Sequence, residues 1–241
     1  MKILEVCVDS LESAINAEKG GAARIELCAN IIIGGTTPSL FLFQEVRENC
    51  SLPIHTLIRP RFGDFCYSES EVRIMTKEII QFKKAGANGV VIGALTPEGF
   101  LDMNVMETLC KAATGMSITL HRAFDMCKDP FDTLNKAVEL KIDTILTSGQ
   151  QNNCIDGADL IKKLVAVKKI DIMAGGGITP DNIKEIITKT GATGYHLTGK
   201  KKIDSKMIFR NKNVNMGFPS ISEYENLVTC ADIIAGVKVQ I

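Results

Sequence analysis

The 241-residue chain contains no tryptophan, and aromatic residues make up only 5% of it. An aromatic platform on which bases or sugar rings could stack is therefore not expected. The formal net charge is zero, whereas a nucleic-acid-binding domain usually carries a basic excess. No apolar run approaches the ~18 residues of a membrane span. The composition thus argues against nucleic acid or membrane as a partner, and no residue pattern indicates an organic cofactor.

Paired cysteine motifs are also missing, although the chain has eight cysteines. None of them lies in a Cys-x-x-Cys pair or at zinc-finger spacing. The N-terminal segment reaches Glu5 too early for a signal peptide, which predicts a cytoplasmic protein. In a reducing cytosol the cysteines should be free thiols rather than a disulfide framework. They are Cys7, Cys28, Cys50, Cys66, Cys110, Cys127, Cys154 and Cys230.

What the chain does have is a regular alternation of short β-type runs and helical patterns. Eight such units suit a (β/α)8 barrel, whose usual size is about 250 residues. A doubly wound open sheet rarely needs eight regular parallel units. We therefore predict an α/β fold, one (β/α)8 barrel domain over residues 1–241. The expected strands are 3–8, 24–28, 54–59, 89–93, 117–120, 143–147, 170–174 and 195–198; the expected helices are 11–19, 40–49, 70–85, 103–113, 131–140, 158–167, 180–190 and 222–234.

The first two expected strands carry nearly the same sequence, Leu-Glu-Val-Cys and Ile-Glu-Leu-Cys. Side chains in a strand alternate between faces, so Glu5 shares a face with Cys7, and Glu26 shares a face with Cys28. A helical stretch separates the two strands, which should therefore run parallel and lie side by side. Two carboxylates and two thiols are thus expected to converge on one region.

The two thiols have more than one interpretation. Free cysteine is among the most buried residue types, so Cys7 and Cys28 could be ordinary core residues. Thiolates also select Cu(I), whereas two of them are too few for a closed structural zinc site. Because the interior layers of a barrel come from alternate strands, the two side chains need not point to the same level.

Ionisable residues gather at the ends of the expected strands. His121 and Asp125 are positioned as a possible acid–base pair, although an ordinary salt-bridge cluster with Arg122 is an equal alternative. A buried ion-pair network with no chemical task is the alternative for the group as a whole. If the protein is an enzyme, the expected proton-transfer residues are Glu5, Glu26, His121, Asp125 and His196.

A glycine-rich turn follows the seventh expected strand. In barrels the common phosphate site lies after strands seven and eight, where backbone N–H groups and helix N-termini favour anions. A tight connection that needs small residues is the simpler interpretation. Arginines could add fixed cations for a carboxylate or a phosphate. The expected anion-binding residues are Gly175, Gly176, Gly177, Arg59, Arg61 and Arg122.

Taken together, these motifs resemble the CutC copper homeostasis family. The resemblance implies a TIM barrel and a cytoplasmic protein associated with copper tolerance. It also implies Cu(I) binding by two cysteines, which correspond to Cys7 and Cys28. The matching segments are 4–7, 24–28, 34–35, 37–39, 58–61, 63–65, Thr119, 121–125, 145–149, 175–178 and His196, whereas Thr36 and Leu120 depart from the family pattern.

Two functions follow from these observations. The first is a copper homeostasis protein that binds or traffics Cu(I) through the two cysteines. The second is a TIM-barrel enzyme that acts on a small phosphorylated or carboxylated metabolite by general acid/base catalysis. The expected partner is accordingly a copper ion or a small anionic metabolite. A homodimer is expected as well, because barrels of this kind often self-associate.

Overall fold

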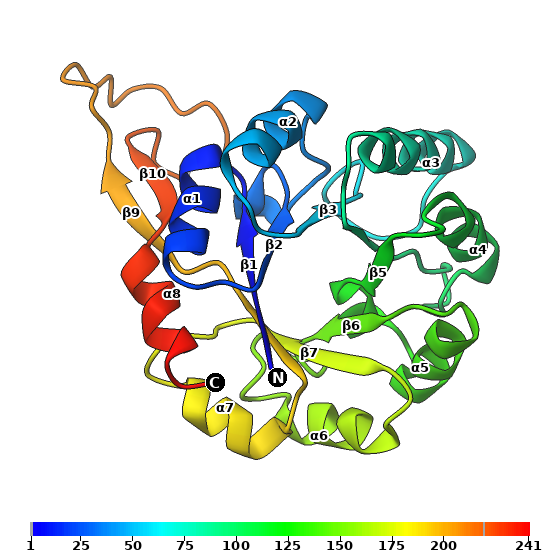
Figure 1. Cartoon of the computed structure of the whole chain (residues 1–241). Helices are drawn as coiled ribbons and strands as arrows, with labels where there is room; N and C mark the ends of the chain where they lie inside the picture. The colour runs from blue at the N-terminus through cyan, green and yellow to red at the C-terminus, as the bar shows by residue number, and fades with distance from the viewer. Residues whose placement is uncertain (1, 219) are drawn as a thin grey trace.

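The computed structural model describes residues 2–218 and 220–241 and contains a closed barrel of eight parallel strands (Figure 1). Each strand pairs with the next one along the chain, and β1 pairs with β8 to close the barrel. This confirms the predicted fold class. The strands are β1 Ile3–Val8, β2 Arg24–Leu27, β3 Ile54–Leu57, β4 Gly89–Ile92, β5 Ser117–Leu120, β6 Thr144–Thr147, β7 Asp171–Gly175 and β8 Gly194–Leu197.

Helices surround the barrel, and several begin where the sequence provides a cap. The Ser10 side chain accepts a hydrogen bond from the Ser13 N–H at the start of the first helix. Ser68 and Glu71 form a capping box before the third. The helices are α1 Leu11–Lys19, α2 Leu40–Asn49, α3 Glu69–Lys84, α4 Met103–Ala112, α5 Pro130–Glu139, α6 Ala158–Val167, α7 Ile183–Thr190 and α8 Ala231–Lys238, with 3-10 turns η1 Ile31–Ile33 and η2 Arg122–Met126.

The start of α7 lies later than predicted. Pro180 was expected to open this helix, but the helix begins at Ile183. The Asn182 side chain accepts from the Thr179 N–H and donates to the Gly177 carbonyl oxygen. These bonds hold residues 177–182 in a turn, so the helix begins only after this turn, at Ile183.

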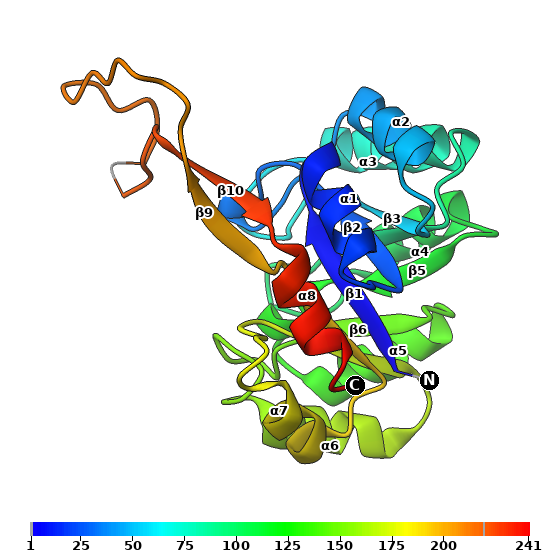
Figure 2. The same ribbon diagram turned by 60° about the vertical axis from the view of Figure 1, so that its left-hand side comes forward.

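The C-terminal region differs from the predicted helix 222–234. Residues 225–229 form β10 (Glu225–Thr229), which pairs antiparallel with β9 (Lys200–Asp204), and α8 follows only at Ala231. The prediction was therefore wrong for the first part of this segment, because pairing with a partner strand overrides the local pattern. The connection between β9 and β10 projects away from the barrel (Figure 2).

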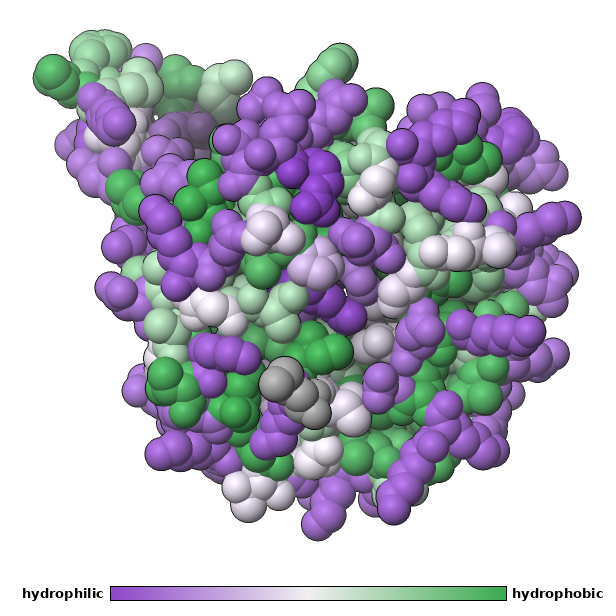
Figure 3. Space-filling view, in the orientation of Figure 1, coloured by the Kyte–Doolittle hydropathy of each residue, from purple (hydrophilic) through white to green (hydrophobic). Residues whose placement is uncertain are grey.

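The described part of this projecting connection, residues 205–218 and 220–224, is rich in exposed apolar side chains. Figure 3 shows them as green atoms at the far end of the projection. Ile208 is fully exposed there, and Phe209 and Met216 are also exposed. No helix among the described residues is long and apolar enough to cross a membrane.

The strands separate an apolar layer from a polar interior. Outward-facing residues such as Val6 and Leu27 are fully buried in the large hydrophobic core between the barrel and its helices. Glu5 and Glu26 lie on the alternate positions of the same strands and are also buried. This alternation places ionisable groups inside the barrel, next to its C-terminal mouth.

Candidate functional site

A cavity of about 330 Å³ opens at the C-terminal end of the barrel strands. This is the end at which active sites of (β/α)8 barrels are built. Apolar side chains of Ile31, Leu57, Phe65, Leu146 and Ile178 form part of its wall. The predicted site residues that line it are Cys7, Glu26, Arg59, His121, Arg122, Gly176, Gly177 and His196.

The two predicted metal-ligating cysteines lie against each other. The Sγ atoms of Cys7 and Cys28 are 3.6 Å apart, so the two side chains do reach the same level of the barrel. Both residues are buried, with exposed fractions of 6% and 0%. The thiol of Cys7 also donates to Glu26 Oε1 at 3.3 Å. The hydrogen bond with Cys28, together with burial, raises the pKa of Cys7 well above its usual value.

A glycine makes room beside this thiol pair. Gly35 has a φ of +81°, and a Cβ atom there would lie 2.8 Å from Leu57 Cδ2 and 3.6 Å from Cys28 Sγ. A larger residue would collide with the wall of the mouth and strain the backbone. The connection after β2 therefore needs glycine at this position to close over the thiols.

Beneath the thiols lies a buried cluster of charged side chains. The carboxylate of Glu5 is fully buried and accepts from Arg24 Nε and, at 2.7 Å, from His196 Nδ1. Burial alone would raise the pKa of Glu5, but the bond from His196 and the charge of Arg24 hold it at about 2. Burial lowers the pKa of His196, but the nearby carboxylates of Glu26 and Glu5 raise it by more than burial lowers it. The pKa of His196 therefore lies above its usual value. The cluster thus favours a carboxylate paired with an imidazolium.

Glu26 connects this cluster to the thiols. Burial raises the pKa of its carboxyl group, and Glu26 Oε2 has no hydrogen-bond partner among the described residues. One ligand atom from each of Cys7, Glu26 and His196 lies within 4.8 Å of the others. The sequence repeat between β1 and β2 therefore does bring carboxylate and thiol groups together.

His121 lies on the opposite side of the mouth, after β5. Its Nδ1 accepts a hydrogen bond from the Ala123 N–H at 3.1 Å, and its ring is 5.0 Å from that of Phe65. Burial, reinforced by the charge of Arg59, lowers the pKa of His121 to about 3. The ring is therefore neutral at neutral pH and, with Nδ1 acting as an acceptor, carries its proton on Nε2.

The predicted acid–base pair of His121 with Asp125 is not formed. The Asp125 carboxylate instead accepts hydrogen bonds from Thr147 Oγ1, Ser148 and the Gln150 N–H. Arg122 Nε also donates to it at 2.7 Å. These bonds tie the η2 turn to the connection after β6, so Asp125 has a structural role. The alternative interpretation, an ordinary cluster with Arg122, describes what the structure shows.

The predicted anion-binding arginines are mostly occupied by backbone groups. Arg59 donates to the carbonyl oxygens of Gly34, Gly35 and Gly63, so it fastens two loops above β3. Arg61 bonds to Glu71 and to neighbouring loop atoms and does not line the cavity. Arg61 therefore lies outside the mouth cavity, whereas Arg59 lines it, with its two terminal nitrogens bound to loop carbonyl groups and its Nε buried without a hydrogen-bond partner among the described residues.

The glycine-rich turn divides into two parts. Gly175 is the last residue of β7 and does not line the cavity. Gly176 and Gly177 follow with φ of +99° and +76°, and both line it. A Cβ at Gly177 would lie 3.2 Å from Asn153 Cβ. The positive φ angles favour glycine at both positions, and a side chain at Gly177 would also crowd Asn153.

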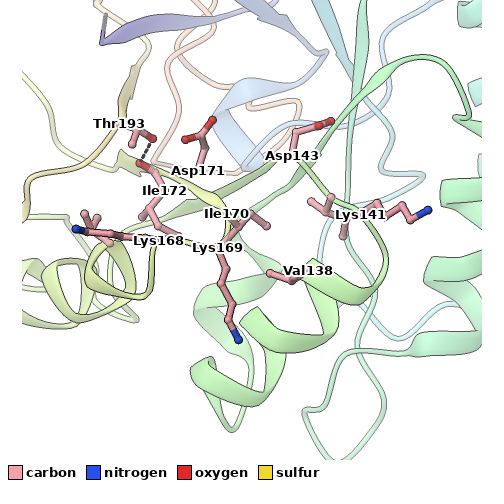
Figure 4. Close-up of a pocket in the computed structure, with 11 residues that line it drawn as sticks. Val138, Lys141, Asp143, Lys168, Lys169, Ile170, Asp171, Ile172 and Thr193 are labelled. Carbon is pink, nitrogen blue, oxygen red and sulfur yellow. Dashed lines mark hydrogen bonds between the residues drawn. The ribbon is translucent and has the colours of Figure 1, made fainter.

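A larger hollow of about 770 Å³ lies at the other end of the barrel, near the start of β6 and β7 (Figure 4). Lys141, Lys168 and Lys169 line it, but their ammonium groups point away from one another. Its polar contact, from Thr193 Oγ1 to the Ile172 carbonyl oxygen, holds two strands together. No converging set of groups marks this hollow as a ligand site.

Two residues of the buried cluster, Arg24 and His55, are not among those predicted from the sequence. Arg24 pairs with Glu5, and His55 lies inside the barrel on β3 with an exposed fraction of 4%. The signal for Arg24 was present, because it precedes Glu26 by two positions and so shares its face. His55 gave no signal, since it lies before the strand end at which barrel sites are usually sought.

Together these features define a (β/α)8-barrel protein with a small mouth cavity, in which a buried thiol pair adjoins a carboxylate–imidazolium cluster. The CutC family model matches residues 2–201, and the chain belongs to the CutC family.

Relatives and solved structures agree with this assignment. A CutC family protein of Photobacterium profundum is 43% identical over 236 residues, covering 97% of this chain and 96% of its own. The copper homeostasis protein cutC homolog of Mus musculus is 44% identical over 230 residues, covering 94% of this chain and 85% of its own. The crystal structure of CutC from Streptococcus agalactiae has a TM-score of 0.77 and 33% identity, covering 82% of this chain and 99% of that chain.

Proposed function

We propose that this chain serves copper homeostasis by binding Cu(I) through Cys7 and Cys28. The observation that carries the proposal is the 3.6 Å separation of the two Sγ atoms on adjacent strands. Two sulfurs so close can bind a single ion with little movement of the backbone. Thiolates are the soft ligands that Cu(I) prefers, and homologues named for copper homeostasis support the same role.

The surroundings of the pair favour a monovalent soft ion. Glu26 and His196 lie within reach of Cys7, and His196 is held in place by the hydrogen bond between its Nδ1 and Glu5. The Cys7 thiol has a raised pKa, so it keeps its proton until a metal displaces it. Burial separates the sulfurs from bulk water and from oxidants, which suits an ion that is stable only when reduced.

An anaerobic Cu(I) competition titration against a chromogenic chelator tests the proposal. The wild type is compared with the Cys7→Ser, Cys28→Ser double variant. The matched control is Cys66→Ser, Cys230→Ser, which removes two thiols that are more exposed than the pair. We expect one tight equivalent of Cu(I) in the wild type and in the control, and its loss in the Cys7, Cys28 variant. Equal binding by all three proteins would show that the pair is not the copper site.

The proposal includes two properties of the protein in the cell. Copper handling by free thiols requires a reducing compartment, so we propose a cytoplasmic location. Cell fractionation followed by immunoblotting tests this, and recovery in another fraction would contradict it. We also propose a homodimer, which sedimentation velocity of the full chain tests directly; a single monomer-sized species at micromolar concentration would contradict it.

A further inference from the structure

We propose that the mouth also binds a second ligand, a small phosphate ester with a carbonyl or hydroxyl oxygen. The phosphate binds to backbone N–H groups of the turn after β7, and the oxygen accepts a hydrogen bond from His121 Nε2. This site uses a different part of the cavity wall from the thiol pair and does not depend on copper binding.

The turn after β7 supplies unused hydrogen-bond donors. The N–H groups of Gly176, Gly177 and Ile178 have no acceptor among the residues that the structure describes. All three residues line the cavity, as does Thr198 after β8. Consecutive N–H groups in a concave turn bind anions such as phosphate.

Arg122 adds a positive charge to the same wall. Its Nε and Nη2 are bound to Asp125 and Ser148, which fixes the plane of the guanidinium. Nη2 also donates to the Gln151 carbonyl oxygen, whereas Nη1 makes no hydrogen bond within the described part of the chain and is available to a ligand. A guanidinium held in this way favours a planar anion or a phosphate.

His121 provides an independent sign of a ligand. It is 6% exposed, lines the cavity, and its Nε2 is buried without a hydrogen-bond partner in residues 2–218 and 220–241. Because Nδ1 accepts from Ala123, the unpartnered Nε2 carries a hydrogen. Buried donors are nearly always paired, so this one is best explained by an acceptor atom that a ligand brings.

The size of the cavity limits the ligand to a small molecule. A volume of about 330 Å³ is near the lower end of ligand pockets, which span about 300–1,000 Å³. His121 follows β5, and the N–H groups follow β7, so a ligand must cross part of the mouth to reach both. The apolar side chains of Phe65 and Leu146 line the same cavity and suit the short carbon chain of such a ligand.

Isothermal titration calorimetry of the metal-free full chain tests this site. The probes are dihydroxyacetone phosphate, erythrose 4-phosphate and ribose 5-phosphate, with free ribose and inorganic phosphate for comparison. We expect at least one ester to bind, inorganic phosphate to bind more weakly, and free ribose not to bind. Failure of every ester to bind the wild type would overturn the proposal.

Two variants locate the two ends of the ligand. Gly177→Ala disturbs the turn and should weaken the binding of both the ester and inorganic phosphate by about tenfold or more. Its control is Gly86→Ala, which has the same left-handed strain (φ +93°) but nothing within 4 Å of the added Cβ. His121→Phe removes the hydrogen-bond donor. It should weaken the binding of the ester by about tenfold and leave the binding of inorganic phosphate unchanged.

The results separate this site from the copper site. The Cys7→Ser, Cys28→Ser variant should bind the ester as the wild type does, even if it loses Cu(I). If Gly177→Ala does not fold by circular dichroism, His121→Phe decides the outcome by itself. Unchanged ester affinity in His121→Phe would contradict the proposed contact with Nε2.

Discussion

Acidification should destabilise the barrel through His55, a residue that lies far inside it. His55 is 4% exposed, and a Cβ atom at Gly89 would lie 2.7 Å from its ring, so the ring has no room for a hydration shell. Burial, only partly opposed by the charge of Glu5, lowers the pKa of His55 to about 4. In the unfolded chain the pKa returns to its usual value of about 6.5.

The sign and the size of the effect follow from proton linkage. At pH 5 the unfolded chain holds a proton on His55, whereas the folded chain does not, so unfolding takes up a proton. Stability is therefore lost as the pH falls from about 6.5 toward the folded pKa of about 4. Between pH 7 and pH 5, His55 alone should lower the free energy of unfolding by about 2 kcal/mol.

The assay is urea unfolding at pH 7 and pH 5, followed by circular dichroism, for the wild type and His55→Gln. The loss of stability on acidification should be about 2 kcal/mol smaller in the variant, because glutamine does not titrate. An equal loss in both proteins would refute the reasoning. So would an NMR titration in which the ring of His55 protonates near pH 6.5 in the folded protein.

Two further variants test the packing and the charges of the interior. Glu5→Gln should lower the free energy of unfolding by about 3–5 kcal/mol, because Arg24, whose side chain is only 11% exposed, loses its carboxylate partner, and urea unfolding at pH 7 measures this. Gly93→Ala should cost about 1–3 kcal/mol, because its Cβ would lie 2.6 Å from His121 Cε1. Gly217→Ala is the control for thermal denaturation, since nothing lies within 4 Å of its Cβ. Equal melting temperatures for the two alanine variants, or unchanged stability in Glu5→Gln, would contradict these expectations.

The eight strands were predictable because each is a short apolar run between helical patterns, and the barrel follows from their number. The hairpin of β9 and β10 was not predictable in the same way. Both of its strands are largely exposed and lack a buried apolar face. Their pairing depends on contacts between residues more than twenty positions apart, from Asp204 with Glu225 to Lys200 with Thr229, which no local pattern reveals.

The site was predictable where strand periodicity applies and not elsewhere. The alternation in β1 and β2 placed Cys7, Glu26 and Cys28 correctly at one mouth. The predicted pairing of His121 with Asp125 was wrong. Both residues follow the end of β5, where the chain leaves the strand and enters the η2 turn. In such a turn the direction of a side chain depends on the hydrogen bonds of the neighbouring loops.

The pairing of β1 with β8 has a consequence for how the protein folds while it is synthesised on the ribosome. Glu5 and His196, which bond between these two strands, are 191 residues apart in the chain. The first strand is therefore synthesised long before its last partner emerges, and its free edge stays open for that time. Pairing at such a separation is slow, so the nascent chain should need chaperone protection until translation is almost complete.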